Sequence, residues 1–116
     1  MTNHFNVEAH SEGSRRVLAV SGELDLAAAS TLEQELDQAL DSGASLIVLD
    51  LKGLDFIDST GLSVLVRGHQ RAQEAGIELG LVNPGAQVER LLSLTGLAQR
   101  LTLDEHLRDG LTETAG

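Results

Sequence analysis

The sequence predicts a single α/β domain built on a mixed sheet of four or five strands, spanning residues 1–116. Segments with the pattern of strands alternate along the chain with segments whose apolar residues recur at helical spacing. The first two strands are separated by a loop of hairpin length, which indicates an antiparallel pair within the sheet. The helical stripes are of moderate width, which suits helices packed on a sheet rather than a helical bundle.

Two strands and a helix are expected in the first part of the chain. Residues 5–9 alternate apolar and polar side chains, a turn around Gly13 follows, and residues 16–21 form a second strand. A helix is expected from Leu26 to Leu40, with Asp25 as its N-cap. Its predicted inner stripe consists of Leu26, Ala29, Leu32, Leu36, Ala39 and Leu40.

The middle of the chain predicts a buried strand followed by a second helix. The continuous apolar run over residues 46–49 is typical of a central strand covered on both faces. The helix is expected from Ser59 to about Ala75, with Gly76 ending it. Its predicted inner stripe consists of Leu62, Leu65, Val66, His69 and Ala72.

The last part of the chain predicts two shorter strands and two shorter helices. A strand over residues 77–82 is followed by Asn83-Pro84, which we expect to cap a third helix. The stripe of that helix is Val88, Leu91, Leu92 and Thr95. An edge strand over residues 101–103, a helix over about 105–111 and a frayed tail from 112 to 116 complete the prediction.

Composition and charge restrict the classes of function. Hydrophobic residues make up 41% of the chain and charged residues 22%, which predicts a packed core. The formal net charge of -10 disfavours direct binding to nucleic acid or to an anionic membrane, and suits a partner protein with a basic or mixed surface. Cysteine is absent, which excludes a disulfide, a thiol nucleophile and a thiolate metal site.

Neither a membrane span nor a signal peptide is expected. No run approaches the roughly 18 apolar residues that span a bilayer. The first five residues lack a basic region followed by an apolar stretch. We therefore expect a cytoplasmic protein.

The segment from Gly53 to Leu62 carries the most chemical information. Asp58, Ser59 and Thr60 are all good capping residues, and the simplest interpretation is that they only satisfy backbone N–H groups at a helix start. Three in a row exceed that need, and the following Gly61 costs helix stability while allowing another chain to approach closely. A hydroxyl at a helix N-terminus is also well placed to carry a phosphate.

Two segments resemble the signatures of STAS domains, which are named for sulfate transporters and anti-sigma factor antagonists. Leu54-Asp55-Phe56-Ile57-Asp58-Ser59-Thr60-Gly61-Leu62 resembles the main signature, and Val20-Ser21-Gly22-Glu23-Leu24-Asp25 resembles the second. Residues 79–84 and 88–97 are similar to the family's later strand and helix, so the resemblance covers nearly the whole chain. It departs from the usual pattern at Thr60, where many members have Ser, and at Ser63, where Gly is common.

The resemblance implies a free-standing anti-sigma factor antagonist, a fold with helices largely on one side of a mixed sheet, and no cofactor. In similar members, the serine equivalent to Ser59 is phosphorylated by a serine kinase that is itself the anti-sigma factor, and a phosphatase restores the hydroxyl. Thr60 is the minor candidate for the acceptor. The unphosphorylated chain, a monomer or weak dimer, would bind the kinase through Asp25, Asp58, Ser59, Thr60, Gly61 and Leu62.

Several alternatives stay open. Asp25 is either a partner contact or only a helix cap, and Asp50 is better explained by a structural role than by a functional one. The four histidines lack the paired spacing of a metal site. No nucleophile elbow, P-loop or dinucleotide fingerprint is present, so we expect no enzyme activity. The rival function is a STAS interaction subunit of another system, either a stress-signalling scaffold or a lipid-transport accessory protein.

Overall fold

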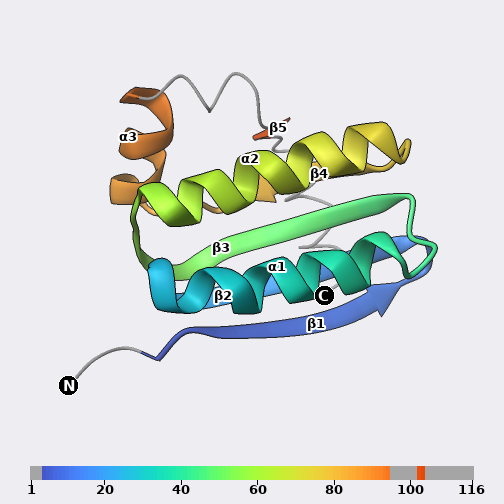
Figure 1. Cartoon of the computed structure of the whole chain (residues 1–116), viewed down its shortest axis with the longest axis horizontal. Helices are drawn as coiled ribbons and strands as arrows, with labels where there is room; N and C mark the ends of the chain where they lie inside the picture. Colours follow the sequence, from blue (N-terminus) through green and yellow to red (C-terminus); the bar gives the residue numbers. More distant parts are fainter. Residues whose placement is uncertain (1–3, 95–101, 104–116) are drawn as a thin grey trace.

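The computed structural model describes residues 4–94 and 102–103 of the chain. Its elements alternate between strand and helix after an opening hairpin (Figure 1). In chain order they are β1 (Asn6–Glu12), β2 (Arg15–Leu24), α1 (Leu26–Leu40), β3 (Leu46–Ile57), α2 (Ser59–Glu74), β4 (Glu78–Val82), α3 (Ala86–Leu94) and β5 (Thr102–Leu103).

The strands form one five-stranded mixed sheet in the order β1-β2-β3-β4-β5. β1 runs antiparallel to β2, and the remaining neighbours pair in parallel. α1 and α2 lie side by side along one face of the sheet (Figure 1). The predicted α/β class, the mixed sheet and the placement of the long helices on one side are all confirmed.

The core lies between that face of the sheet and the two long helices. One large cluster of buried side chains joins β2, β3 and β4 to α1, α2 and α3. A second, smaller cluster of Val17, Val48 and Val82 lies on the opposite face of the sheet. Residues 47–49 of β3 are completely buried, which confirms that this strand is covered on both faces.

Strand β3 is much longer than the apolar run that predicted it. It continues past Leu49 to Ile57, and β2 continues correspondingly to Leu24. The pairing between the two strands contains register shifts between Ala19 and Ser21 and between Gly22 and Glu23. In β3 these irregularities interrupt the alternation of buried and exposed side chains, so simple periodicity predicts too short a strand.

The bounds of α1 match the prediction, but one member of its stripe does not. Leu26 was expected in the core and is 75% exposed. The buried face of α1 is centred on Ala28, Ala29, Leu32, Leu36 and Ala39, and the first residue of the helix lies to one side of it.

The inner face of α2 also differs from the prediction. Val66 and His69 are only half-buried, whereas Val64 and Gly68 are buried. The face is rotated because α2 packs against α1 as well as the sheet: a Cβ atom on Gly68 would lie 3.0 Å from Cδ1 of Leu36.

Gly76 ends α2, as expected, through a Schellman motif. Its φ angle is +73°, and its N–H donates to the carbonyl of Gln73 while the N–H of Ile77 donates to that of Ala72. Asn83 does not cap α3 as predicted: its side chain donates to Asp50, and the helix begins at Ala86.

The predicted edge strand is present as β5. Thr95, the predicted helix over 105–111 and the frayed tail lie outside the described residues. Within residues 4–94, no helix combines the length and hydropathy needed to cross a membrane.

Candidate functional site

Two helix starts lie next to each other where β2 and β3 end. Leu24 and Ile57 are partners in the parallel pairing of the two strands, and the N–H of Asp58 donates to the carbonyl of Leu24 at 3.2 Å. Each strand is followed directly by an aspartate and then by a helix. Asp25 and Asp58 therefore occupy equivalent places in two strand–helix units. These two units are adjacent in the fold (Figure 1).

Both aspartates cap their helices. Oδ1 of Asp25 accepts from the backbone N–H of Ala28 at 3.1 Å, and Oδ1 of Asp58 accepts from that of Gly61 at 2.9 Å. The predicted N-cap roles are confirmed. Both side chains are half-buried, so their remaining carboxylate surface still reaches the solvent at this edge.

Ser59 is the first residue of α2 and is exposed. Its carbonyl accepts a hydrogen bond from the hydroxyl of Ser63 at 3.0 Å, one turn along the helix. The following Thr60 is only half-buried. Because Asp58 already caps the helix, the hydroxyl of Ser59 is not needed for capping.

Gly61 is required by the chain's own packing. A Cβ atom at this position would lie 2.7 Å from Cγ of Leu24 and 2.8 Å from both the Leu24 carbonyl oxygen and Cγ1 of Ile57. The glycine therefore lets the first turn of α2 settle on the ends of two strands. Internal packing is thus enough to explain the glycine, and its contact with another chain stays a prediction.

The predicted site residues thus divide into two layers. Asp25, Asp58, Ser59 and Thr60 reach the surface along one edge, whereas Gly61 and Leu62 are buried beneath it and support the turn. Asp58, Ser59, Thr60, Gly61 and Leu62 are neighbours in the sequence. The pairing of β2 with β3 places Asp25 beside them.

Sequence reasoning missed the apolar contribution to this edge. Among residues 4–94, the large hydrophobic side chains that are exposed belong to Leu26, Phe56 and Leu94. Leu26 directly follows Asp25, and Phe56 stands two positions before Asp58. A hollow of about 330 Å³ adjoins the first turn of α1, lined by His4, Phe5, Glu23, Asp25, Ala27, Ala28 and Thr31.

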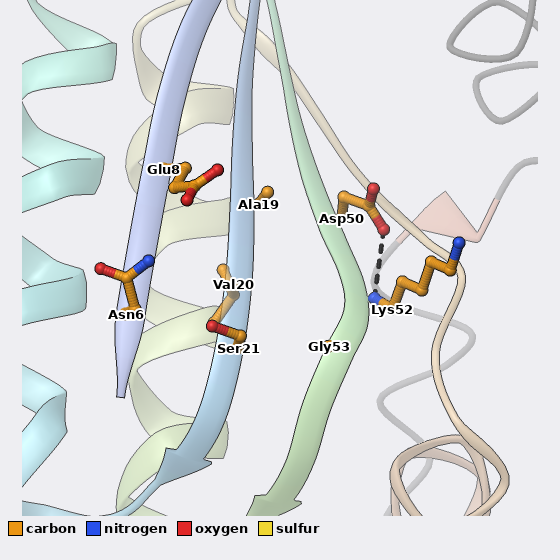
Figure 2. Close-up of a pocket in the computed structure, with 8 residues that line it drawn as sticks. All are labelled: Asn6, Glu8, Ala19, Val20, Ser21, Asp50, Lys52 and Gly53. Carbon is orange, nitrogen blue, oxygen red and sulfur yellow. Dashed lines mark hydrogen bonds between the residues drawn. The ribbon is translucent and has the colours of Figure 1, made fainter. Parts of the chain in front are cut away.

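Asp50 lies apart from this edge and has a structural role, as predicted. Its Oδ1 accepts from the backbone N–H of Lys52 and from Nδ2 of Asn83, both at 3.1 Å, which ties β3 to the end of β4. Asp50 also lines a hollow of about 450 Å³ across β1, β2 and β3 (Figure 2). The lining of this hollow includes the small residues Ala19, Ser21 and Gly53.

Within residues 4–94, no group of three or more histidine or acidic side chains has the arrangement needed to hold a metal ion. The carboxylates at the edge, those of Asp25 and Asp58, are each engaged by a helix N-terminus. The arrangement is therefore an acidic surface that carries the exposed residues Ser59 and Leu26.

Comparisons with known proteins agree with this architecture. The family described as the STAS domain matches residues 6–110. The anti-sigma F factor antagonist of Paenibacillus polymyxa is 32% identical over 112 residues, which cover 94% of this chain and 96% of that protein.

Solved structures show the same fold. An anti-sigma factor antagonist from Mycobacterium paratuberculosis superposes with a TM-score of 0.82 at 27% identity, over 97% of this chain and 96% of that one. The phosphorylated form of the Bacillus cell fate determinant SpoIIAA superposes with a TM-score of 0.69 at 20% identity, over 93% and 99% of the two chains. Together with the match over residues 6–110, these similarities show that the chain belongs to the STAS domain family and is homologous to anti-sigma factor antagonists.

Proposed function

We propose that this protein is a partner-switching anti-sigma factor antagonist whose state is set by phosphorylation of Ser59. In the unphosphorylated state it binds an anti-sigma factor that is also a serine kinase, and the sigma factor is released. The observation that carries the proposal is the exposed hydroxyl of Ser59 on the first turn of α2, beside an aspartate that already caps the helix. The related SpoIIAA, which shares this fold, has been solved in a phosphorylated form.

The phosphoryl transfer needs only an accepting oxygen from this chain. Oγ of Ser59 would attack the γ-phosphorus of ATP bound to the kinase, the bond to the β-phosphate oxygen would break, and ADP would leave. The kinase supplies the magnesium ion and the base that takes the hydroxyl proton. A separate serine phosphatase would return the chain to the binding state.

The fold of this chain should tolerate the phosphate. The modification adds about 1.5 to 2 negative charges at pH 7, and a helix N-terminus stabilises negative charge. At an interface the same group would have to be desolvated next to Asp58, which costs several kcal/mol and lowers the affinity by about 100-fold or more. The switch would therefore work by exclusion of the partner rather than by refolding.

The testing experiment combines the purified protein with the candidate anti-sigma kinases of its host and Mg-ATP. Intact mass and peptide sequencing locate the phosphate, and calorimetry measures kinase binding before and after the reaction. Ser59→Ala and Thr60→Ala test the two candidate acceptors, and Ser63→Ala is the matched control, because it removes another exposed hydroxyl from the same helix.

One added phosphate that is lost only in Ser59→Ala, together with weaker kinase binding after modification, would support the proposal. Loss of the phosphate only in Thr60→Ala would identify Thr60, instead of Ser59, as the acceptor. If the wild-type chain neither binds nor accepts phosphate from any of these kinases, the sigma-factor role is wrong. The chain would then be a STAS interaction subunit of another system.

A further inference from the structure

Leu26 is an exposed leucine that the fold does not explain. It is the first residue of α1, and its side chain is 75% exposed. The apolar contact that commonly fixes a helix start joins the residue before the N-cap to the fourth helical residue. In α1 those residues are Leu24 and Ala29, both buried in the main core cluster, so Leu26 is not needed for this contact.

Leu26 is also the structural counterpart of Ser59. Each is the first helical residue after a capping aspartate, and the strands before them are paired at Leu24 and Ile57. Because the first turn of α2 rests on Leu24, the two helix starts share one edge of the sheet (Figure 1). Axes of packed helices are about 8–10 Å apart, and a typical interface covers about 800 Å² on each protein. A partner that reaches Ser59 would therefore also cover Leu26.

Leu26 is surrounded by acidic side chains and lies next to a hollow in the surface. The carboxylates of Asp25 and Asp58 lie at the same edge, and Glu23 precedes them on β2. The hollow of about 330 Å³ adjoins the turn that carries Leu26, and Glu23 and Asp25 are among its lining residues. An apolar projection with carboxylates around it is complementary to an apolar pocket bordered by lysine and arginine.

We propose that Leu26 is an apolar anchor through which the anti-sigma kinase docks on the edge that carries Ser59. This inference rests on the proposed function and adds the chemistry of the partner: a pocket for one leucine, with basic residues at its rim. Leu26 and Ser59 would then both be covered by the same bound kinase. A phosphate on Ser59 would add charge that must be desolvated before Leu26 can be buried, so a single modification would disable the whole contact.

The test measures binding of the unphosphorylated chain to the kinase that modifies Ser59. Leu26→Gln replaces the apolar side chain by a neutral one of similar length that is equally suited to a helix. Leu26→Met keeps the apolar character. Leu94→Gln is the matched control, because Leu94 is 74% exposed but belongs to α3. Urea unfolding of each variant checks that the fold is unchanged.

We expect Leu26→Gln to raise the Kd by about tenfold or more, which corresponds to about 1.4 kcal/mol, while Leu26→Met and Leu94→Gln stay within about threefold of wild type. The KM for phosphorylation of Ser59 should rise with the Kd at unchanged kcat, because Leu26 does not contact the reacting oxygen.

Equal affinity of Leu26→Gln and wild type would overturn the anchor and leave the phosphoswitch intact. An equal loss in Leu94→Gln would also overturn it, since the effect would then not be specific to this edge. A wild-type chain that no kinase binds or modifies would remove the proposed function, and the anchor with it.

Discussion

Gly61 and Leu24 lie so close together that a side chain on the glycine would collide with the end of β2. A Cβ atom at Gly61 would stand 2.7 Å from Cγ of Leu24 and 2.8 Å from its carbonyl oxygen, and the latter belongs to the backbone. Because position 61 has no side chain, the first turn of α2, which carries Ser59, can pack directly against the end of β2.

This contact predicts that Gly61→Ala destabilises the protein, although alanine is the better helix former. The gain in helix propensity is about 1 kcal/mol, whereas forcing a methyl group into a packed site costs about 1–3 kcal/mol. We expect a net loss of up to about 2 kcal/mol in urea unfolding. Gly68→Ala is the comparison: its Cβ would meet only the flexible end of Leu36, at 3.0 Å, and should be close to neutral. Equal stability of the two variants would show that the Gly61 contact relaxes without cost.

The two roles of Asp25 can be separated by substitution. Asparagine keeps an oxygen that accepts from the N–H of Ala28, so Asp25→Asn should unfold within about 0.5 kcal/mol of wild type, whereas Asp25→Ala should lose about 1 kcal/mol. If the carboxylate also faces the basic rim of a partner, Asp25→Asn weakens kinase binding by about three- to tenfold, mainly through slower association at low salt. Unchanged association kinetics in Asp25→Asn would leave Asp25 as a cap alone.

A large part of the fold follows from local patterns, and the failures have identifiable causes. The bounds of α1 are predictable because Asp25 is a strong N-cap and the apolar spacing is regular from Ala29 onward. The length of β3 is not predictable from alternation, because the register shifts opposite Ser21 and Glu23 change which side chains face the core. Pairing between distant strands creates those shifts, and no local window contains them.

The candidate site likewise has a part that the sequence predicts and a part that it does not. The signature around Ser59 is contiguous, so its members were identifiable as a group. The spacing places Leu26 in the core because it stands three residues before Ala29, but the buried face of α1 also includes Ala28, which turns that face away from Leu26. The reason for Gly61 was equally hidden, since Leu24 is distant in sequence and adjacent only through strand pairing.

Two ion pairs connect the long helices and should contribute little. Arg67 pairs with Glu33 and Arg71 with Asp37, and all four side chains are at least 42% exposed. Exposed pairs are worth about 0.2–1 kcal/mol each and are screened by salt. Arg71→Gln should therefore lower the unfolding free energy by less than about 1 kcal/mol at low salt, with most of the difference gone in 1 M NaCl. A loss that persists in high salt would mean that the arginine stem packs against α1.

Substitution of Asp50 should lower the free energy of unfolding without affecting the phosphorylation of Ser59. Asp50→Ala removes the acceptor for the backbone N–H of Lys52 and for the side chain of Asn83, and should cost about 1–3 kcal/mol. The carboxylate is on the face of the sheet away from the helices, so the rate of Ser59 phosphorylation by the kinase should be unchanged under conditions where the variant is folded. A slower reaction in a fully folded Asp50→Ala protein would place this face in contact with the partner.

Replacement of Ser59 by aspartate separates the fold from the interface. The new carboxylate lies in the first turn of α2, where the helix dipole stabilises negative charge by about 0.3–1 kcal/mol, and the neighbouring Asp58 opposes part of that gain. We expect Ser59→Asp to unfold within about 1 kcal/mol of wild type and to bind the kinase at least tenfold more weakly, because a charge at the interface must be desolvated without a partner. Ser63→Asp, which adds the same charge one turn further along α2, is the control. If Ser59→Asp loses binding only in proportion to a loss of stability, exclusion at the interface is the wrong mechanism and a change of fold has to replace it.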